Sequence, residues 1–151
     1  MPDQGYDTDL ALWAESQARA LRDAGRSRTN LPIDWENVAE EIEALAKSQT
    51  RELASRLRTI LVHLMKLQAS PAPEPRGGWR ESIIEQRSEI ERVIEDSPSL
   101  RQGVAAIIAR ETGPARRQVA LALADHGETP RVDLENANYT EADVLGDWLP
   151  D

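Results

Sequence analysis

The residues best suited to chemistry in this sequence are centred on His63, one of only two histidines in 151 residues. A neutral imidazole can act as a general base or as a metal ligand near neutral pH. Glu52 stands four residues before Arg56, and Arg56 seven before His63, so on an α-helix the three share one side. Such a set can form a catalytic site or a hydrogen-bonded structural network, and we favour the network.

The spacings that metal and nucleophile chemistry require are absent from the sequence. A di-iron carboxylate bundle uses Glu-x-x-His steps, but Ile60 stands three residues before His63 and Leu123 three before His126. There is no His-Glu-x-x-His, no Gly-x-Ser-x-Gly and no cysteine. We therefore predict no metal, no cofactor and no catalytic residue. The alternative is a hydrolytic or metal-assisted enzyme that uses His63 and nearby carboxylates.

The element that positions His63 is a long amphipathic helix predicted over residues 35–69. Asp34 can cap its N-terminus, so the helix should begin at Trp35, and apolar residues then recur every three or four positions from Val38 to Leu67. A straight helix of this length would span about 52 Å, which exceeds the roughly 40 Å diameter of a compact chain of this size. We expect a bend or break at the polar residues 48–50, and we expect the apolar face to be buried.

Further helical patterns cover most of the remaining chain. They run from Thr8 to Ala24, from Trp79 to Glu95, from Ser97 onward and briefly from Thr140 to Leu145, with Ser97 and Thr140 as the N-caps of the last two. Gly113-Pro114 interrupts the pattern after Ser97, either as a kink or as the end of one helix and the start of another. Residues 69–78 form a Pro/Gly connector, and residues 125–151 an extended acidic segment. The predicted fold is all-α, a helical bundle of about four to six helices in a single domain, 1–151. The bulky core residues should include three tryptophans: Trp13, Trp35 and Trp79.

A second helix supplies polar residues that face the first. Gln86 and Arg87 flank the apolar stripe of residues 79–95, and Glu41 borders the stripe of residues 35–69. A charge inside a packed core persists only when it is paired and hydrogen-bonded. We therefore predict a polar seam in which Arg87 pairs with Glu52 or Glu41 and His63 bonds a neighbouring group. Its members are Glu41, Glu52, Arg56, His63, Gln86 and Arg87.

The charge distribution limits the partners. A net charge of −9 argues against binding to nucleic acid, which needs clustered bases. No apolar run is long enough for a membrane span, and without cysteine nothing suggests an oxidising compartment, so we expect a cytoplasmic protein. Residues 118–151 hold eight acids and one base, whereas residues 49–117 hold nine acids and twelve bases. The acidic segment should dock on this basic middle, within one chain or between two, anchored by Trp148.

Short motifs along nearly the whole chain are similar to one protein family. They are Tyr6-Asp7-Thr8-Asp9 with Trp13, Asp34-Trp35-Glu36-Asn37, Leu61-Val62-His63-Leu64-Met65-Lys66, Gln86-Arg87, Ser97-Pro98-Ser99-Leu100 and Tyr139-Thr140. In order and spacing they resemble the bacterial family called domain of unknown function 29, although Leu67 stands where members tend to carry tryptophan. The resemblance implies a helical cytosolic protein and supplies no activity, cofactor or catalytic residue.

The functional hypothesis that follows is a non-enzymatic helical protein. It would act through protein–protein interaction with an unidentified partner, or through self-association as a homo-oligomer, by means of an apolar face.

Overall fold

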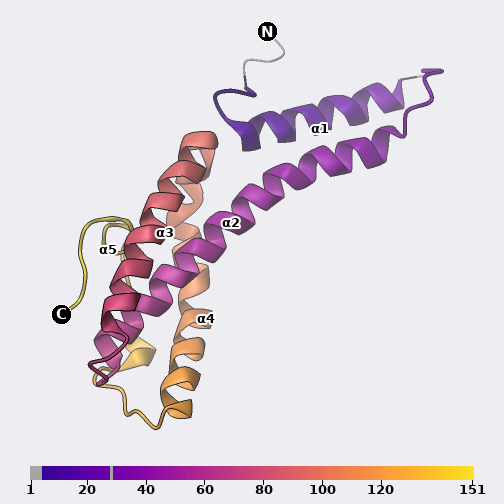
Figure 1. Ribbon diagram of the computed structural model, residues 1–151. Helices are drawn as coiled ribbons and strands as arrows, with labels where there is room; N and C mark the ends of the chain where they lie inside the picture. Colours follow the sequence, from indigo (N-terminus) through magenta and orange to yellow (C-terminus); the bar gives the residue numbers. More distant parts are fainter. Residues whose placement is uncertain (1–4, 28) are drawn as a thin grey trace. The chain divides into compact units, whose positions relative to one another are not determined.

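The protein consists of helices and turns, without a strand in residues 5–27 and 29–151, which the computed structural model describes (Figure 1). The α-helices in these residues are α1 (Leu10–Arg26), α2 (Trp35–Ala69), α3 (Arg76–Asp96), α4 (Val104–Asp125) and α5 (Glu141–Leu145). Two 3₁₀ segments, η1 (Pro98–Gly103) and η2 (Leu134–Asn136), lie between them. The predicted all-α class is confirmed.

Helix α2 begins and ends at the predicted residues, Trp35 and Ala69. The Asp34 carboxylate accepts a hydrogen bond from the Asn37 backbone N–H at 3.3 Å, which satisfies one of the unpaired donors of the first turn. Of the predicted bend or break at residues 48–50, the break is wrong, because α2 is helical without interruption over 35 residues. The Thr50 hydroxyl donates to the Ala46 carbonyl one turn earlier, at 3.3 Å, so this polar side chain finds its hydrogen-bond partner within α2.

The bounds of three other helices differ from the predicted bounds or decide between predicted alternatives. Helix α1 extends past Gly25 to Arg26, so this glycine lies inside the helix. Helix α3 begins at Arg76 and takes Gly77 into its first turn, where the sequence predicted a connector up to residue 78. Helix α4 passes through Pro114 without ending, so of the two alternatives predicted there, the end of one helix and the start of another is excluded. At Gly25 the close packing of the helix against Trp35 outweighs the low helix propensity of glycine.

The chain divides into two compact units, and α2 and α3 each contribute to both. The first unit contains the chain up to Glu52 together with Arg92–Arg101, and the second contains Leu53–Glu91 and Gln102–Asp151. In the first unit, α1 and the first part of α2 form an antiparallel hairpin (Figure 1). Its buried cluster consists mainly of alanine, with Ala11, Ala14 and Ala46 at the centre.

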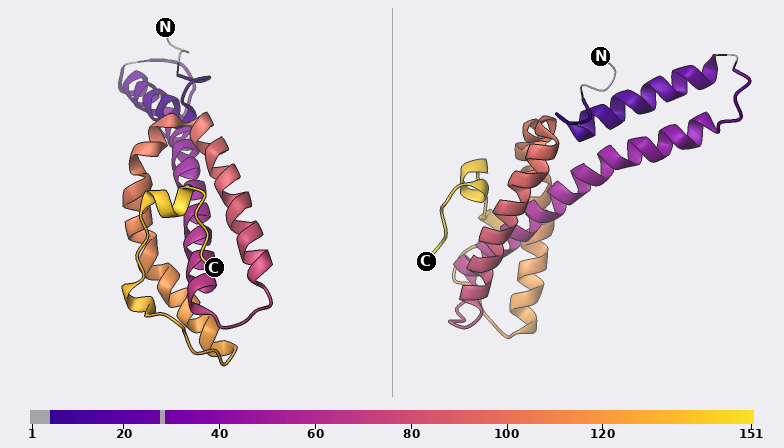
Figure 2. Two further views of the ribbon diagram at one scale, coloured as in Figure 1. Left: turned by 90° about the vertical axis from the view of Figure 1, so that its left-hand side faces the viewer. Right: turned by 45° about the horizontal axis from the view of Figure 1, so that its top comes forward.

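The second unit has a larger core built around the second part of α2. Ile60, Leu61, Val62, Leu64 and Met65 are all at most 4% exposed, so this stretch is buried nearly all round. Helices α3 and α4 flank it, and the C-terminal segment with α5 crosses the outside of these helices (Figure 2, left). Other core members come from all of these elements: Leu53, Leu57, Ile83, Ile90, Val104, Val119 and Val144.

Candidate functional site

The first unit is held together by an exchange of helix caps. The buried Asp9 carboxylate accepts from the Leu12 N–H of its own helix at 2.9 Å, and also from the Ser99 N–H at 2.6 Å and the Ser99 hydroxyl at 3.0 Å. The Ser97 hydroxyl, itself fully buried, accepts from the Ala11 N–H at 3.0 Å and donates to the Gln49 side chain at 3.4 Å. Asp9 therefore caps the starts of both α1 and η1.

The sequence assigned Ser97 as the cap of the helix that follows it, and the structure corrects this. Its hydroxyl instead serves α1, while the helix start that begins with Pro98 is served by Asp9. Each segment thus satisfies the other's unpaired donors, which locks the relative position of α1 and η1. These residues belong to the Tyr6–Asp9 and Ser97–Leu100 motifs, so a structural role explains them.

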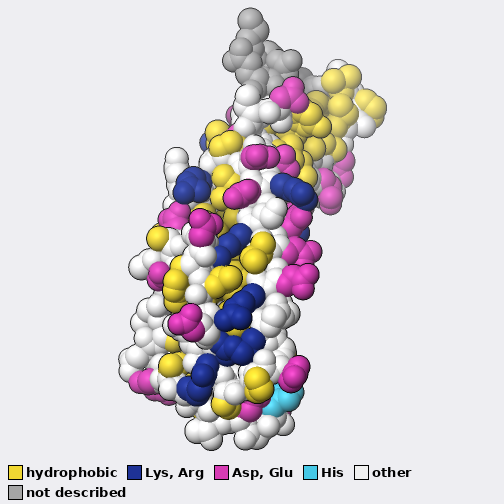
Figure 3. All heavy atoms as spheres, turned by 60° about the vertical axis from the view of Figure 1, so that its left-hand side comes forward, with side chains coloured by type: hydrophobic (Ala, Val, Ile, Leu, Met, Phe, Trp, Pro, Cys, Tyr) yellow, Lys and Arg dark blue, Asp and Glu magenta, His cyan; other side chains and the backbone are white. Residues whose placement is uncertain are grey.

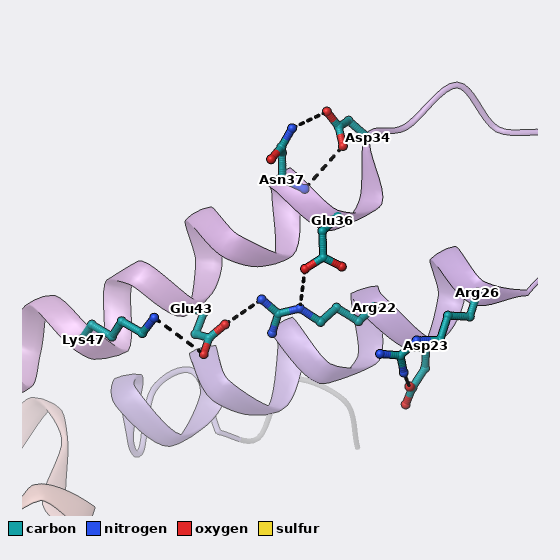
Figure 4. Close-up of polar contacts among 8 residues, drawn as sticks. All are labelled: Arg22, Asp23, Arg26, Asp34, Glu36, Asn37, Glu43 and Lys47. Atoms are coloured by element: carbon teal, nitrogen blue, oxygen red, sulfur yellow. Dashed lines mark hydrogen bonds and ion pairs between the residues drawn. The ribbon is translucent and has the colours of Figure 1, made fainter.

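One flank of the hairpin is closed by ion pairs (Figure 4). The Arg22 guanidinium lies 3.0 Å from Glu36 and 2.7 Å from Glu43, both on α2. The hydrogen bond from Arg22 lowers the pKa of Glu43, and the positive charges of Arg22 and Lys47 add to this effect. We call this side, defined by Arg22, Glu36, Glu43 and Lys47, the ionic flank.

The opposite side of the hairpin is apolar and partly open. At 100° per residue, Val38, Ile42 and Leu45 lie on the side of α2 away from Glu36 and Glu43. The half-buried Ile42 and Leu45 pack on the alanine cluster, as does Trp13 of α1. Towards the loop between the helices, however, Leu31 is 60%, Ile33 43% and Val38 40% exposed. We call this side, with the exposed loop residues that precede α2, the apolar flank; its members are Trp13, Leu31, Ile33, Val38, Ile42 and Leu45.

The apolar flank corrects the expectation that the whole stripe of α2 would be buried. Val38 lies in that stripe and remains exposed, because the partner of α2 at this level is α1, which approaches from one side. The three tryptophans were predicted as bulky core residues, but Trp13, Trp35 and Trp79 are all only partly buried. The Trp35 ring packs against Gly25, and its buried indole N–H has no hydrogen-bond partner among the described residues.

In the second unit, part of the predicted polar seam is present. The Arg56 guanidinium on α2 donates to the Gln86 side chain on α3 at 3.0 Å and lies 3.9 Å from the Glu89 carboxylate. The two helices are thus joined by a bridge of charged and amide groups at the edge of the core. Glu89 was not predicted, although its spacing of three residues from Gln86 places it on the same side of α3.

Arg87 has different partners from those predicted. Its guanidinium donates to three backbone carbonyls of the C-terminal segment: Val144 at 2.8 Å, Asp143 at 3.0 Å and Trp148 at 2.7 Å. It does not pair with Glu52 or Glu41, and the Glu41 side chain is exposed. Burial lowers the pKa of Arg87, and the nearby Asp147 opposes that shift. Arg87 is therefore the residue that holds the C-terminal segment.

The C-terminal segment does lie on basic residues, but its apolar anchor is Val144, which is fully buried, whereas Trp148 is 41% exposed. Arg116 adds a second clasp, since its guanidinium donates to the Ala137 carbonyl at 2.9 and 2.6 Å. The Tyr139 hydroxyl donates to the Gln68 side chain at 2.5 Å, and burial raises the pKa of Tyr139 to about 12. The arginines meet backbone oxygens here, a pairing that no helical wheel can predict.

His63 does not make the hydrogen bond that we predicted. Its Nδ1 atom is buried without a hydrogen-bond partner in the described part of the chain. Burial lowers the pKa of His63, and the charge of Lys66 lowers it further, so the imidazole is neutral at pH 7. A neutral ring can accept a proton, but among the described residues no carboxylate bonds to Nδ1 to orient the ring as a general base.

The described residues hold neither a cluster of metal ligands nor a membrane-spanning helix. Within residues 5–27 and 29–151, no three His, Asp or Glu side chains are grouped closely enough to hold an ion. In the same residues, no helix has the length and apolar character needed to cross a membrane.

Comparisons with other proteins agree with this fold. A family model described as "Domain of unknown function DUF29" matches residues 6–148, and no curated protein matches the sequence. A crystal structure of an α-helical protein of unknown function from Rhodospirillum rubrum is 28% identical, with a TM-score of 0.74; the match covers 94% of this chain and 89% of that chain. Since the family model spans nearly all of the sequence, the chain belongs to the DUF29 family of helical proteins of unknown function.

Proposed function

We propose that this protein is a non-enzymatic helical protein that acts through protein–protein contact, and that its contact surface is the apolar flank of the α1–α2 hairpin. The observation that supports this is the exposure of three neighbouring apolar side chains, Leu31, Ile33 and Val38, at 40% or more. Leu31 and Ile33 lie in the loop before α2 and Val38 near its start, and a short stretch with three large exposed apolar residues is typical of an interaction surface.

A second copy of the chain fits this flank. The alanine-rich contact keeps α1 and α2 close, so the hairpin is a thin layer with one apolar side. Two such layers facing each other make a four-helix arrangement in which each hairpin covers the other. A twofold pairing places the same residues on both sides, and the ionic flank, which points away, is left unchanged.

The size of the apolar flank predicts a weak to moderate affinity. Covering one half-exposed Leu, Ile or Val contributes about 1 kcal/mol, so three in each copy contribute on the order of 6 kcal/mol. That figure corresponds to a dissociation constant of tens of micromolar, before the cost of ordering side chains is subtracted. Because that cost weakens the affinity, self-association should appear only at concentrations of tens of micromolar and above.

Sedimentation velocity across a concentration series tests the proposal. We expect the wild type to shift from monomer to dimer and Val38→Glu to remain monomeric, because a carboxylate in the apolar interface would lose its hydration. Leu121→Glu is the matched control, since Leu121 is also a branched apolar side chain, 67% exposed on α4 in the second unit. Circular dichroism confirms that both variants are folded. If the wild type stays monomeric at every concentration, or if Val38→Glu and Leu121→Glu dimerise alike, the proposal is wrong.

A further inference from the structure

A hollow in the second unit lies beside the C-terminal segment and is separate from the apolar flank. Its volume is about 630 Å³, which is large enough for a small organic molecule. Side chains from the end of α2 and from the chain after α4 line it, among them Gln68, Arg131, Val132, Trp148, Leu149 and Asp151. Both polar and apolar groups therefore face the same space.

Positive charge gathers around this hollow. The guanidinium groups of Arg131 and Arg80 donate to the carbonyls of Leu67 and Pro150, at 3.2 and 3.3 Å, and Arg76 donates to the main-chain oxygen of Asp151. The Leu67 and Pro150 carbonyls are neutral acceptors and leave the charges of Arg131 and Arg80 in place, whereas the negative charge of Asp151 acts on Arg76. Burial lowers the pKa of Arg76, the charges of Arg131 and Arg80 add to that shift, and the charge of Asp151 opposes it, so positive groups outnumber the negative one around Arg76. Figure 3 shows Lys and Arg side chains in a row on the face that it draws, with Asp and Glu side chains beside them.

The hollow also has an apolar wall with a fixed aromatic ring. Trp148 and Val132 are each 41% exposed although both line the hollow. The Trp148 ring lies 6.3 Å from the Tyr139 ring, and its carbonyl is held by Arg87 at 2.7 Å. The Gln68 side-chain oxygen already accepts from Tyr139 at 2.5 Å, so its amide N–H groups are the part that can bind a ligand.

We propose that this hollow binds a small organic oxyanion, a carboxylate or phosphate that carries a flat apolar group. The Arg131 guanidinium uses one N–H for the Leu67 carbonyl and has others to offer to the oxyanion, supported by the Gln68 amide. The apolar group lies against Trp148 and Val132. The Asp151 carboxylate at the rim repels anions, so the site takes an anion whose apolar part is also recognised, rather than any negative charge.

Isothermal titration calorimetry at low ionic strength tests the site with four probes: phenylphosphate, benzoate, inorganic phosphate and the neutral benzamide. We expect phenylphosphate and benzoate to bind one per chain, and inorganic phosphate and benzamide to bind at least about tenfold more weakly, because each lacks one of the two recognised features. Binding of phenylphosphate alone identifies phosphates as the source of the ligand, and binding of benzoate alone identifies carboxylates.

Two substitutions separate charge from apolar recognition. Arg131→Gln should weaken phenylphosphate binding at least about tenfold, whereas Arg110→Gln, which changes a surface arginine of α4, should leave it unchanged. Trp148→Leu should weaken phenylphosphate and leave inorganic phosphate as weak as before. Because Trp148→Leu keeps every charge, it tests the site even if Arg131→Gln does not fold. The inference is overturned if no probe gives a saturable heat or if benzamide binds as well as benzoate. It is also overturned if Arg131→Gln and Trp148→Leu bind phenylphosphate like the wild type.

Discussion

Replacing Asp9 by alanine tests the cap exchange that organises the first unit. The change removes acceptors for the Leu12 N–H, the Ser99 N–H and the Ser99 hydroxyl at once. A lost helix cap typically costs about 1 kcal/mol, and a hydrogen bond to a charged group contributes about 1.5–3 kcal/mol. Since Asp9 is only 9% exposed, water replaces its carboxylate poorly. Two caps together lead us to expect a loss of about 3 kcal/mol.

Hydrogen exchange locates this loss. At about 1.4 kcal/mol per tenfold, 3 kcal/mol raises the opening equilibrium of the α1 amides roughly a hundredfold, and the core amides of the second unit should change much less. Asp9→Asn, which keeps an oxygen acceptor without the charge, should fall between the wild type and Asp9→Ala. Asp7→Ala is the control, because Asp7 is exposed two residues away. Equal exchange in Asp7→Ala and Asp9→Ala would show that the cap exchange does not hold α1.

Three further changes address packing, the C-terminal segment and pH. Gly25→Ala should destabilise by about 1–3 kcal/mol in chemical denaturation, because the added Cβ would lie 2.5 Å from the Cβ of Trp35; Gly113→Ala, in open helix surface, should instead stabilise by about 0.5–1 kcal/mol. Arg87→Ala should cost about 2–3 kcal/mol by losing charged hydrogen bonds and should speed proteolysis after residue 133; unchanged cleavage would mean that this arginine does not hold the segment. The pKa of His63 is lowered in the fold, so its contribution to stability is complete above about pH 6.5 and is lost as the pH falls towards the folded pKa. Chemical denaturation at about pH 7.5 and about pH 5 measures this loss, and the free energy of unfolding of His63→Gln should fall less between the two pH values than that of the wild type. An equal fall in both proteins would refute the argument that burial lowers the pKa of His63.

Local features were predictable because they depend on neighbours in sequence. The Asp34 cap and the start of α2 at Trp35 follow from the first turn alone, and so does the Thr140–Asp143 capping box of α5. The 3.6-residue period likewise identified each long helix and the side of α2 that carries Arg56. Of the candidate site, the sequence could place Arg56 and Gln86 at the edges of stripes that meet, and the structure joins them at 3.0 Å.

The contacts that the sequence could not predict depend on which part of another helix or segment lies opposite each residue. A helical wheel gives the angle of Arg87 but not what lies opposite, and its acceptors are backbone carbonyls, which every residue has and no sequence pattern marks. Asp9 and Ser99 are ninety residues apart in the chain, so only the fold brings them to 2.6 Å.

The exposure of Val38 also depends partly on the sequence and partly on the tertiary structure. The sequence by itself determined which side of α2 is apolar, because side-chain direction repeats every 3.6 residues. Only the tertiary structure decided which part of that side is covered. Helix α1 approaches α2 on a narrow contact of alanine and Gly25, whose small side chains bring the backbones together and leave the larger apolar groups beyond the contact exposed. Burial requires a second surface at the right distance, and the period of one helix carries no information about where that surface lies.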